Sequence, residues 1–263
     1  MSFALKTACD LRHTIKKPPL PQIFILRSLR VSGFAFIFPL EIIRTVVLFY
    51  LDMPATLTIH DGRLIKGNET RAAILQVAIQ IASEEGLEGL SLGRLADDVG
   101  MSKSGLFAHF RSKEDLQLAV VDAARDLFIA QVVTPARKFP AGIQRLRKLA
   151  DTWLAYAQGH VFRGGCFFVA ASMEFDSRPG RVRDRVCELM AGWLAALATE
   201  VRQAKANKEL AQNADEQQIA FEFNAQMMGA NWAFQLLKDK KAFARARTAM
   251  MERLESFAPR RRH

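Results

Sequence analysis

The chain has 263 residues, 50% of them hydrophobic, which is enough for one large domain or two small ones with a substantial core. Lys and Arg exceed Asp and Glu by ten (37 against 27), a balance that is compatible with a polyanionic partner but does not require one. Three cysteines, Cys9, Cys166 and Cys187, are too few for a disulfide framework and lack the spacing of metal ligands, so we expect a protein of the reducing cytoplasm with no bound metal and no cofactor.

Residues 1–62 differ in composition from the rest of the chain. Residues 31–50 are mostly apolar, and the run has the length of a membrane-spanning helix. Glu41 and Arg44 lie near its middle, where charges are costly in hydrocarbon, and no small-residue cleavage site of a signal peptide follows it. Met53 would be a natural start ahead of the first convincing helix. We therefore expect residues 1–62 to be an atypical extension, disordered or dispensable, with no obligate membrane partner; a membrane anchor is the alternative.

From residue 68 onward the chain is almost entirely helical in pattern, because apolar residues recur every three or four positions. Residues typical of helix ends divide the first part of this region into four helices. The predicted helices are about 70–85, closed by Gly86; a short helix capped by Ser91 and broken at Gly100; 103 to 109 or 110, capped by Ser102; and 113 to about 133, capped by Ser112 and ended by Pro135.

The second and third predicted helices are short and joined by a tight glycine turn, with the small residue Ala96 at their crossing. This arrangement is typical of a helix-turn-helix. Leu106 and Phe110 would anchor the later of the two helices, which leaves the small and polar residues 102–105 and His109 facing outward. Such a face suits the major groove of DNA, although a small helical bundle with a solvated face would show the same pattern.

Two stretches within residues 70–124 carry a resemblance to a known family: "SLGRLADDVGMSKSGLFAHF" and "FRSKEDL". The segment closely resembles the DNA-binding domain of the TetR family of bacterial regulators. The resemblance implies an all-helical homodimer whose C-terminal domain binds a small molecule. It also implies contacts to the DNA backbone from His109 and Lys113. Phe107 matches a position that is usually tyrosine, and without the hydroxyl its contact could only be apolar.

The candidate DNA-binding residues lie at the caps and on the outward faces of the second and third helices and at the start of the fourth. They are Ser91, Arg94, Ser102, Lys103, Ser104, Gly105, Phe107, His109 and Lys113. We expect Lys103 and Lys113 to contact phosphates, and changes at Ser104 or His109 to alter the preference among sequences.

The rest of the chain predicts amphipathic helices at about 140–159, 181–206, 215–237 and 241–257, with a short apolar helix after Gly164. Large aromatic and flexible side chains in this region can line an adaptable pocket, although at helical spacing each is more often part of the core. The candidate effector-binding residues are Trp153, Phe167, Phe168, Met173, Trp193, Met227, Asn231 and Trp232. The helices at 181–206 and 215–237 carry more apolar residues than one core face needs, which predicts a four-helix dimer interface.

No phosphate-binding glycine loop, carboxylate pair or metal-ligand cluster occurs in the sequence, and Cys166 lies in an apolar run typical of an inert thiol, so no enzymatic activity is expected. The predicted fold is all-α: a three-helix DNA-binding domain with a helix-turn-helix at 63–112, then a helical ligand-binding and dimerisation domain at 113–258, with a basic tail at 259–263. The predicted function is a transcriptional regulator, a repressor released from a palindromic operator in double-stranded DNA by a small apolar or amphipathic effector. An effector-independent or membrane-tethered DNA-binding protein is the alternative.

Overall fold

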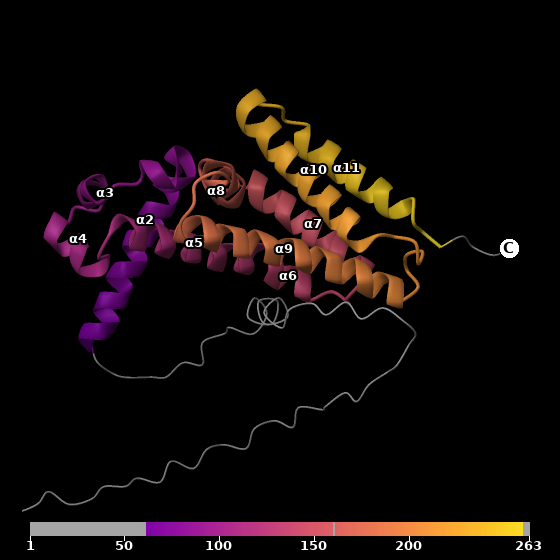
Figure 1. Ribbon diagram of the computed structural model, residues 1–263, viewed down its shortest axis with the longest axis horizontal. Helices are drawn as coiled ribbons and strands as arrows, with labels where there is room; N and C mark the ends of the chain where they lie inside the picture. The colour runs from indigo at the N-terminus through magenta and orange to yellow at the C-terminus, as the bar shows by residue number, and fades with distance from the viewer. Residues whose placement is uncertain (1–61, 160, 260–263) are drawn as a thin grey trace, which may run out of the picture. The chain divides into compact units, whose positions relative to one another are not determined.

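The computed structural model describes residues 62–159 and 161–259, except for the side chains of residues 62–66. The predicted extension up to residue 61, with its apolar segment 31–50, lies outside the described residues, and so do residues 260–263 of the basic tail. Every regular element of the described part is a helix, as predicted (Figure 1). The elements are α2 (Gly62–Gly89), α3 (Leu92–Asp98), α4 (Lys103–His109), α5 (Lys113–Phe128), the π-helix η1 (Ile129–Val133), α6 (Thr134–Arg137), α7 (Ile143–Gln158), α8 (Phe167–Phe175), α9 (Arg181–Ala206), α10 (Glu216–Leu237) and α11 (Ala242–Glu255).

The predicted serine caps at the starts of α3, α4 and α5 are confirmed. The hydroxyls of Ser91, Ser102 and Ser112 each accept a hydrogen bond from the amide three residues later, at 3.0 to 3.2 Å. Each bond satisfies one of the backbone donors that a helix leaves free at its N-terminus. The local sequence therefore sets where the three helices begin.

One predicted helix end is confirmed and one is wrong. Gly86 interrupts α2 with a non-helical conformation (φ 81°, ψ 164°), as predicted, and a short second helical stretch follows as far as Gly89. Pro135 does not end the fourth helix, because α5 passes through η1 into α6 with the proline in its first turn. A proline is tolerated there because its missing N–H is not needed at the start of a helix, and a π-helix changes the hydrogen-bonding register just before it.

The turn between α3 and α4 is fixed by buried side chains and local hydrogen bonds. Ala96 is fully buried, and its carbonyl accepts a hydrogen bond from the Met101 amide (2.9 Å). Gly100 takes the left-handed conformation (φ 65°) that glycine adopts without a steric penalty. Leu106 and Phe110, the predicted anchors of α4, are 0% and 1% exposed. The helix-turn-helix geometry follows from these few local residues.

In the C-terminal bundle, α9 is the central helix and contacts α5, α7, α8 and α10, while α11 packs on α10 (Figure 1). Val186, Trp193 and Leu197 of α9 are buried within the protomer, because a helix surrounded on several sides is apolar beyond one face. The four-helix dimer interface of α9 and α10 stays a prediction. Within the described residues, no helix is both long enough and apolar enough to cross a membrane.

Candidate DNA-binding surface and ligand cavity

The outward face of α4 carries short polar side chains and one ring. Lys103 and Ser104 are exposed, Gly105 and His109 are partly exposed, and Phe107 is 49% exposed. The Ser102 hydroxyl, besides capping the helix, lies 3.1 Å from the Ser104 hydroxyl. Because these side chains are short, a partner can approach the backbone of the N-terminal turn of α4 closely.

Two of the cations among the candidate DNA-binding residues are already paired. The Lys113 ammonium donates to the carbonyl oxygen of Glu88 (2.7 Å) and to its carboxylate (3.1 Å). Arg94 forms ion pairs with Glu85 and, at 3.7 Å, with Asp98. Both would have to exchange these partners to reach DNA. Lys103, by contrast, forms no ion pair with any residue that the structure describes, so its charge is available.

Arg71 of α2 fixes the other end of α4. Its guanidinium donates a hydrogen bond to the His109 carbonyl (3.1 Å) and lies 4.4 Å from the centre of the Phe110 ring. A cation over an aromatic face adds attraction to the packing of the stem. Arg71 therefore holds the C-terminus of α4 on α2, a role that the sequence did not reveal because its partners lie 38 residues away.

A second set of contacts joins α2 to the turn before α8. The Gln80 amide donates to the Val161 carbonyl (3.0 Å) and accepts from the Arg163 amide (3.1 Å). The Ser83 hydroxyl accepts from the Gly164 amide at 3.2 Å. We call this set of contacts, between residues 80–83 and 161–164, the α2–α8 junction.

Glu174 of α8 adds a carboxylate to the same side of α2. Its two oxygens accept hydrogen bonds from the amides of Leu87 and Glu88, both at 2.8 Å, just after the bend at Gly86. These amides are free to bond because the bend interrupts the helical pattern. The DNA-binding helices and α8 are thus connected by directed hydrogen bonds as well as by packing.

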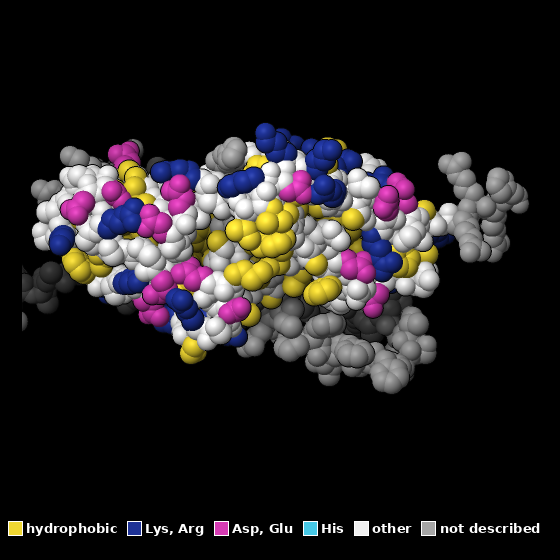
Figure 2. Space-filling view, turned by 90° about the horizontal axis from the view of Figure 1, so that it is seen from above, with side chains coloured by type: hydrophobic (Ala, Val, Ile, Leu, Met, Phe, Trp, Pro, Cys, Tyr) yellow, Lys and Arg dark blue, Asp and Glu magenta, His cyan; other side chains and the backbone are white. Residues whose placement is uncertain are grey.

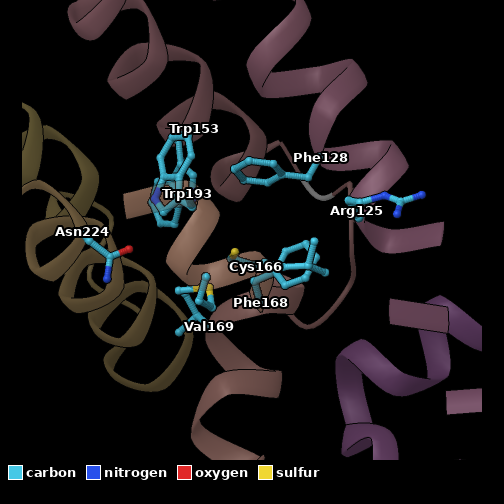
Figure 3. A pocket seen from close by; sticks show the side chains of 10 residues that line it. Arg125, Phe128, Trp153, Cys166, Phe168, Val169, Trp193 and Asn224 are labelled. Atoms are coloured by element: carbon cyan, nitrogen blue, oxygen red, sulfur yellow. The ribbon is translucent and has the colours of Figure 1, made fainter. Parts of the chain in front are cut away.

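A cavity lies in the C-terminal bundle, between α5, α7, α8, α9 and α10 (Figure 3). Its walls are mainly aromatic and aliphatic. Its free volume is about 30 Å³, room for about two water molecules. The lining residues are Arg125, Phe128, Trp153, Cys166, Phe168, Val169, Leu189, Met190, Trp193 and Asn224. Cavities of this composition are typical of small-molecule sites.

The cavity thiol of Cys166 is buried among apolar side chains. Burial raises the pKa of Cys166 to about 11, so the thiol stays protonated at neutral pH. Burial also raises the pKa of the neighbouring Tyr156 hydroxyl well above its usual value. Within the described residues there is also no cluster of groups that could hold a metal ion.

The structure separates the eight candidate effector-binding residues. Trp153, Phe168 and Trp193 line the cavity. Phe167 and Met227 are buried outside its lining, and the buried Asn231 side chain accepts a hydrogen bond from the Cys166 amide (2.9 Å). Met173 and Trp232 are exposed on the surface. Phe128 and Asn224 also line the cavity, and the sequence analysis did not predict this. Helical periodicity indicates which face of a helix a side chain lies on, but not which neighbouring helix it contacts.

The exposed residues Met173, Trp232 and Leu236 line an open groove between α8 and α10, together with Met228. Their exposed fractions are 60%, 55% and 64%. Figure 2 shows apolar side chains gathered in a patch on the face that carries α10. Clusters of large exposed apolar side chains are typical of protein–protein interfaces.

Comparison with known proteins gives two family matches. Residues 74–120 match the model described as "Bacterial regulatory proteins, tetR family", and residues 142–250 match "Tetracyclin repressor-like, C-terminal domain". An HTH-type transcriptional regulator of Staphylococcus aureus is 36% identical over 61 residues, 23% of this chain and 33% of the relative, so the chain matches a third of that relative's length.

Solved structures show the same fold over most of the chain. A TetR transcriptional regulator from Chloroflexus aurantiacus has 24% identity and a TM-score of 0.69, covering 74% of this chain and 98% of that one. A structure of AibR in complex with isovaleryl coenzyme A and operator DNA has 21% identity and a TM-score of 0.57, covering 72% and 98%.

Proposed function

Because the chain belongs to the TetR family and is a transcriptional regulator, we propose that it acts in the cytoplasm as a homodimeric repressor that leaves a palindromic operator when a small molecule occupies the cavity. The observation that carries the proposal is the outward face of α4, polar and unobstructed, on a helix anchored from behind by Leu106 and Arg71. The similar AibR structure, which holds operator DNA and a small molecule together, supports a regulator with both kinds of site. The proposal includes no catalytic step.

On DNA, the residues of α4 would make different kinds of contact, according to the chemistry of their side chains. Lys103 would contact a phosphate, and Ser104 and His109 would meet base edges near the start and end of the helix. Phe107 would make an apolar contact, for which the methyl group of thymine is a suitable partner. Lys113 would contribute less than the sequence suggested, because leaving Glu88 offsets what a phosphate contact would gain.

The homodimer would form through the α8–α10 groove and the exposed side of α10. Trp232 and Leu236 lie four residues apart on this helix, and Phe221 lies eleven residues before Trp232, so all three share one face and are more than half exposed. Covering these side chains with the same face of a second copy would remove three large exposed apolar residues of each protomer from water. Two copies would then present two α4 helices to successive major grooves.

Release would follow from the α2–α8 junction. Cys166 and Phe168 line the cavity, and the segment that carries them begins two residues after Gly164, which is hydrogen-bonded to Ser83 of α2. A ligand that shifts the start of α8 would therefore move α2, and with it α4. The effector would change the populations of two spacings of the DNA-binding units rather than the α4 surface itself.

The test begins with selection of binding sites for the full chain from random duplex DNA. We expect an inverted repeat whose half-sites lie about one helical turn apart. Lys103→Ala should weaken binding to all sequences similarly and reduce the salt dependence by about one phosphate contact per half-site. Lys240→Ala removes an equally exposed charge next to the C-terminal end of α10 and serves as the matched control. Unchanged affinity and salt dependence in the Lys103 variant would refute the proposed surface.

A further inference from the structure

We propose that the cavity binds an uncharged aromatic molecule of one ring that carries a single hydroxyl or similar hydrogen-bonding group, which meets Asn224. The inference rests on the proposed function in taking this cavity as the effector site, and it adds the chemical class of the ligand. Three features of the lining carry it: the orientation of its rings, the pairing of its one cation, and a side-chain amide that lacks a strong partner.

The rings around the cavity pack edge-to-face on one another and would meet a further ring in the same way. Phe128 stands edge-to-face against Trp193 (centroids 5.2 Å apart, interplanar angle 87°) and against Phe168 (5.9 Å, 84°). Aromatic rings attract one another in this arrangement because the edge of one meets the face of the next. As the structure stands, the free space would hold only about two water molecules, so a ring can enter only where lining side chains move aside. The flexible Met190 is the lining side chain best able to do so.

The lining offers no free charge to a charged ligand. Arg125 is its one ionisable group with a permanent charge, and its guanidinium is hydrogen-bonded to Asp126 (2.7 and 2.9 Å) and to Asp122 (3.4 Å). Figure 3 shows this guanidinium turned away from the cavity, so that the aliphatic stem forms the wall. A carboxylate or an ammonium group would enter an apolar space without a counter-charge, which is strongly unfavourable.

Asn224 supplies the polar contact. It lies at the other end of the cavity from Arg125 (Figure 3). Its amide nitrogen donates to the sulfur of Met228 at 3.2 Å, a weak acceptor, and its carbonyl oxygen accepts no hydrogen bond from any residue that the structure describes. An amide can both donate and accept, and a hydroxyl can do the same, so one ligand hydroxyl can satisfy either side of Asn224.

The chain contains its own reporters of binding. Of its three tryptophans, Trp153 and Trp193 line the cavity and Trp232 lies on the surface. In the full chain carrying Trp232→Phe, tryptophan fluorescence therefore comes from the cavity alone. The probes are benzyl alcohol, toluene, benzoate and benzylammonium, which share one ring and differ in charge and hydrogen bonding. A variant with Trp153→Phe and Trp193→Phe keeps the surface tryptophan and serves as the control.

Benzyl alcohol should change the cavity fluorescence saturably and leave the control unchanged. Benzoate and benzylammonium should bind at least about tenfold more weakly, because neither finds a counter-charge. Asn224→Leu keeps the size of the side chain and should reduce the preference for benzyl alcohol over toluene by about two- to tenfold, the usual net contribution of one hydrogen bond. Val169→Trp, which fills the space, should abolish the signal for every probe.

Equal or tighter binding of either charged probe, an unchanged preference in Asn224→Leu, or no binding of any probe would overturn the inference. DNA binding, measured separately on the selected inverted repeat, keeps the two proposals apart. If benzyl alcohol binds as described but leaves the DNA complex intact, the ligand class stands and release by this cavity fails. If charged compounds release DNA without changing the cavity fluorescence, the effector acts at another site, so release by this cavity fails and the regulator stands.

Discussion

A Gly164→Ala substitution adds a single methyl group that would force apart the two sides of the α2–α8 junction. A Cβ at this position would lie 1.7 Å from the Ser83 carbonyl oxygen and 2.4 Å from its carbonyl carbon, both atoms of the α2 backbone. To reach even 3.0 Å from that oxygen, the turn would have to retreat by at least 1.3 Å, since 3.0 minus 1.7 is 1.3. Gly164→Ala should therefore break the junction hydrogen bonds to Gln80 and Ser83.

The junction contains three such bonds, at 3.0, 3.1 and 3.2 Å. At about 0.5–1.5 kcal/mol for each, and because the site is partly exposed, we expect unfolding to become easier by about 2 kcal/mol. Urea denaturation of the full chain measures this change, and titration with the selected operator measures DNA affinity. Gly67→Ala is the matched control, since a Cβ at Gly67 meets nothing within 4 Å and alanine suits a helix better than glycine.

The operator affinity of Gly164→Ala should fall and its response to ligand should weaken, because α8 can then move without moving α2. The reasoning would be refuted if the variant kept both the stability of the unchanged protein and its full release by ligand. A fall in stability with an intact ligand response would show that the junction stabilises the fold without transmitting the signal.

Four further predictions concern the core, the thiols and the dimer. Ala96→Leu should destabilise the N-terminal helices by about 1–3 kcal/mol, because the position is fully buried at a helix crossing; loss of operator binding with a lowered urea midpoint would show it, and an unchanged midpoint would contradict the packing. In a Cys9→Ser background, iodoacetamide at mildly alkaline pH should modify the exposed Cys187 and leave Cys166, whose pKa is about 11, unmodified until the protein unfolds; mass spectrometry distinguishes the two. Since burial raises the folded pKa of Cys166 above its unfolded value, its contribution to stability is complete below the unfolded pKa and should be lost as the pH rises towards 11, a dependence that Cys166→Ala removes. Trp232→Glu should convert dimers into monomers in sedimentation at micromolar protein, whereas Glu255→Gln on α11 should not; a dimer that survives the Trp232 change would place the interface elsewhere.

The helix-turn-helix could be predicted from the sequence because its determinants are local. The caps at Ser91 and Ser102, the left-handed Gly100 and the buried Ala96 all lie within twelve residues of the chain. Each constrains the backbone through its immediate neighbours, so the pattern carries the geometry with it. The bounds of α9 were predictable for the same reason, since Gly180 precedes the helix and its apolar residues recur regularly.

The features that the sequence did not reveal depend on partners far along the chain. Nothing in the sequence near Lys113 indicates that its ammonium group is paired, yet it donates a hydrogen bond to Glu88, 25 residues earlier. The Glu174 carboxylate accepts hydrogen bonds from the amides of Leu87 and Glu88, which lie more than eighty residues earlier in the chain. Helical periodicity does not indicate such a contact. Trp193 and Trp232 look equivalent in sequence, but one lines the cavity and the other lies on the surface, because burial depends on how whole helices pack.

The proposed contact between α4 and DNA is tested most directly by placing a photo-crosslinker on the helix. Phe107→benzoylphenylalanine puts a light-activated group of similar shape on the exposed face of α4, and Phe139→benzoylphenylalanine puts the same group on a ring that is 39% exposed, just after α6. Irradiation of each full-chain variant on the selected inverted repeat should link the protein to DNA from position 107 and not from position 139. Absence of a DNA adduct from position 107, or equal adducts from both positions, would contradict the assignment of α4 as the DNA-reading helix.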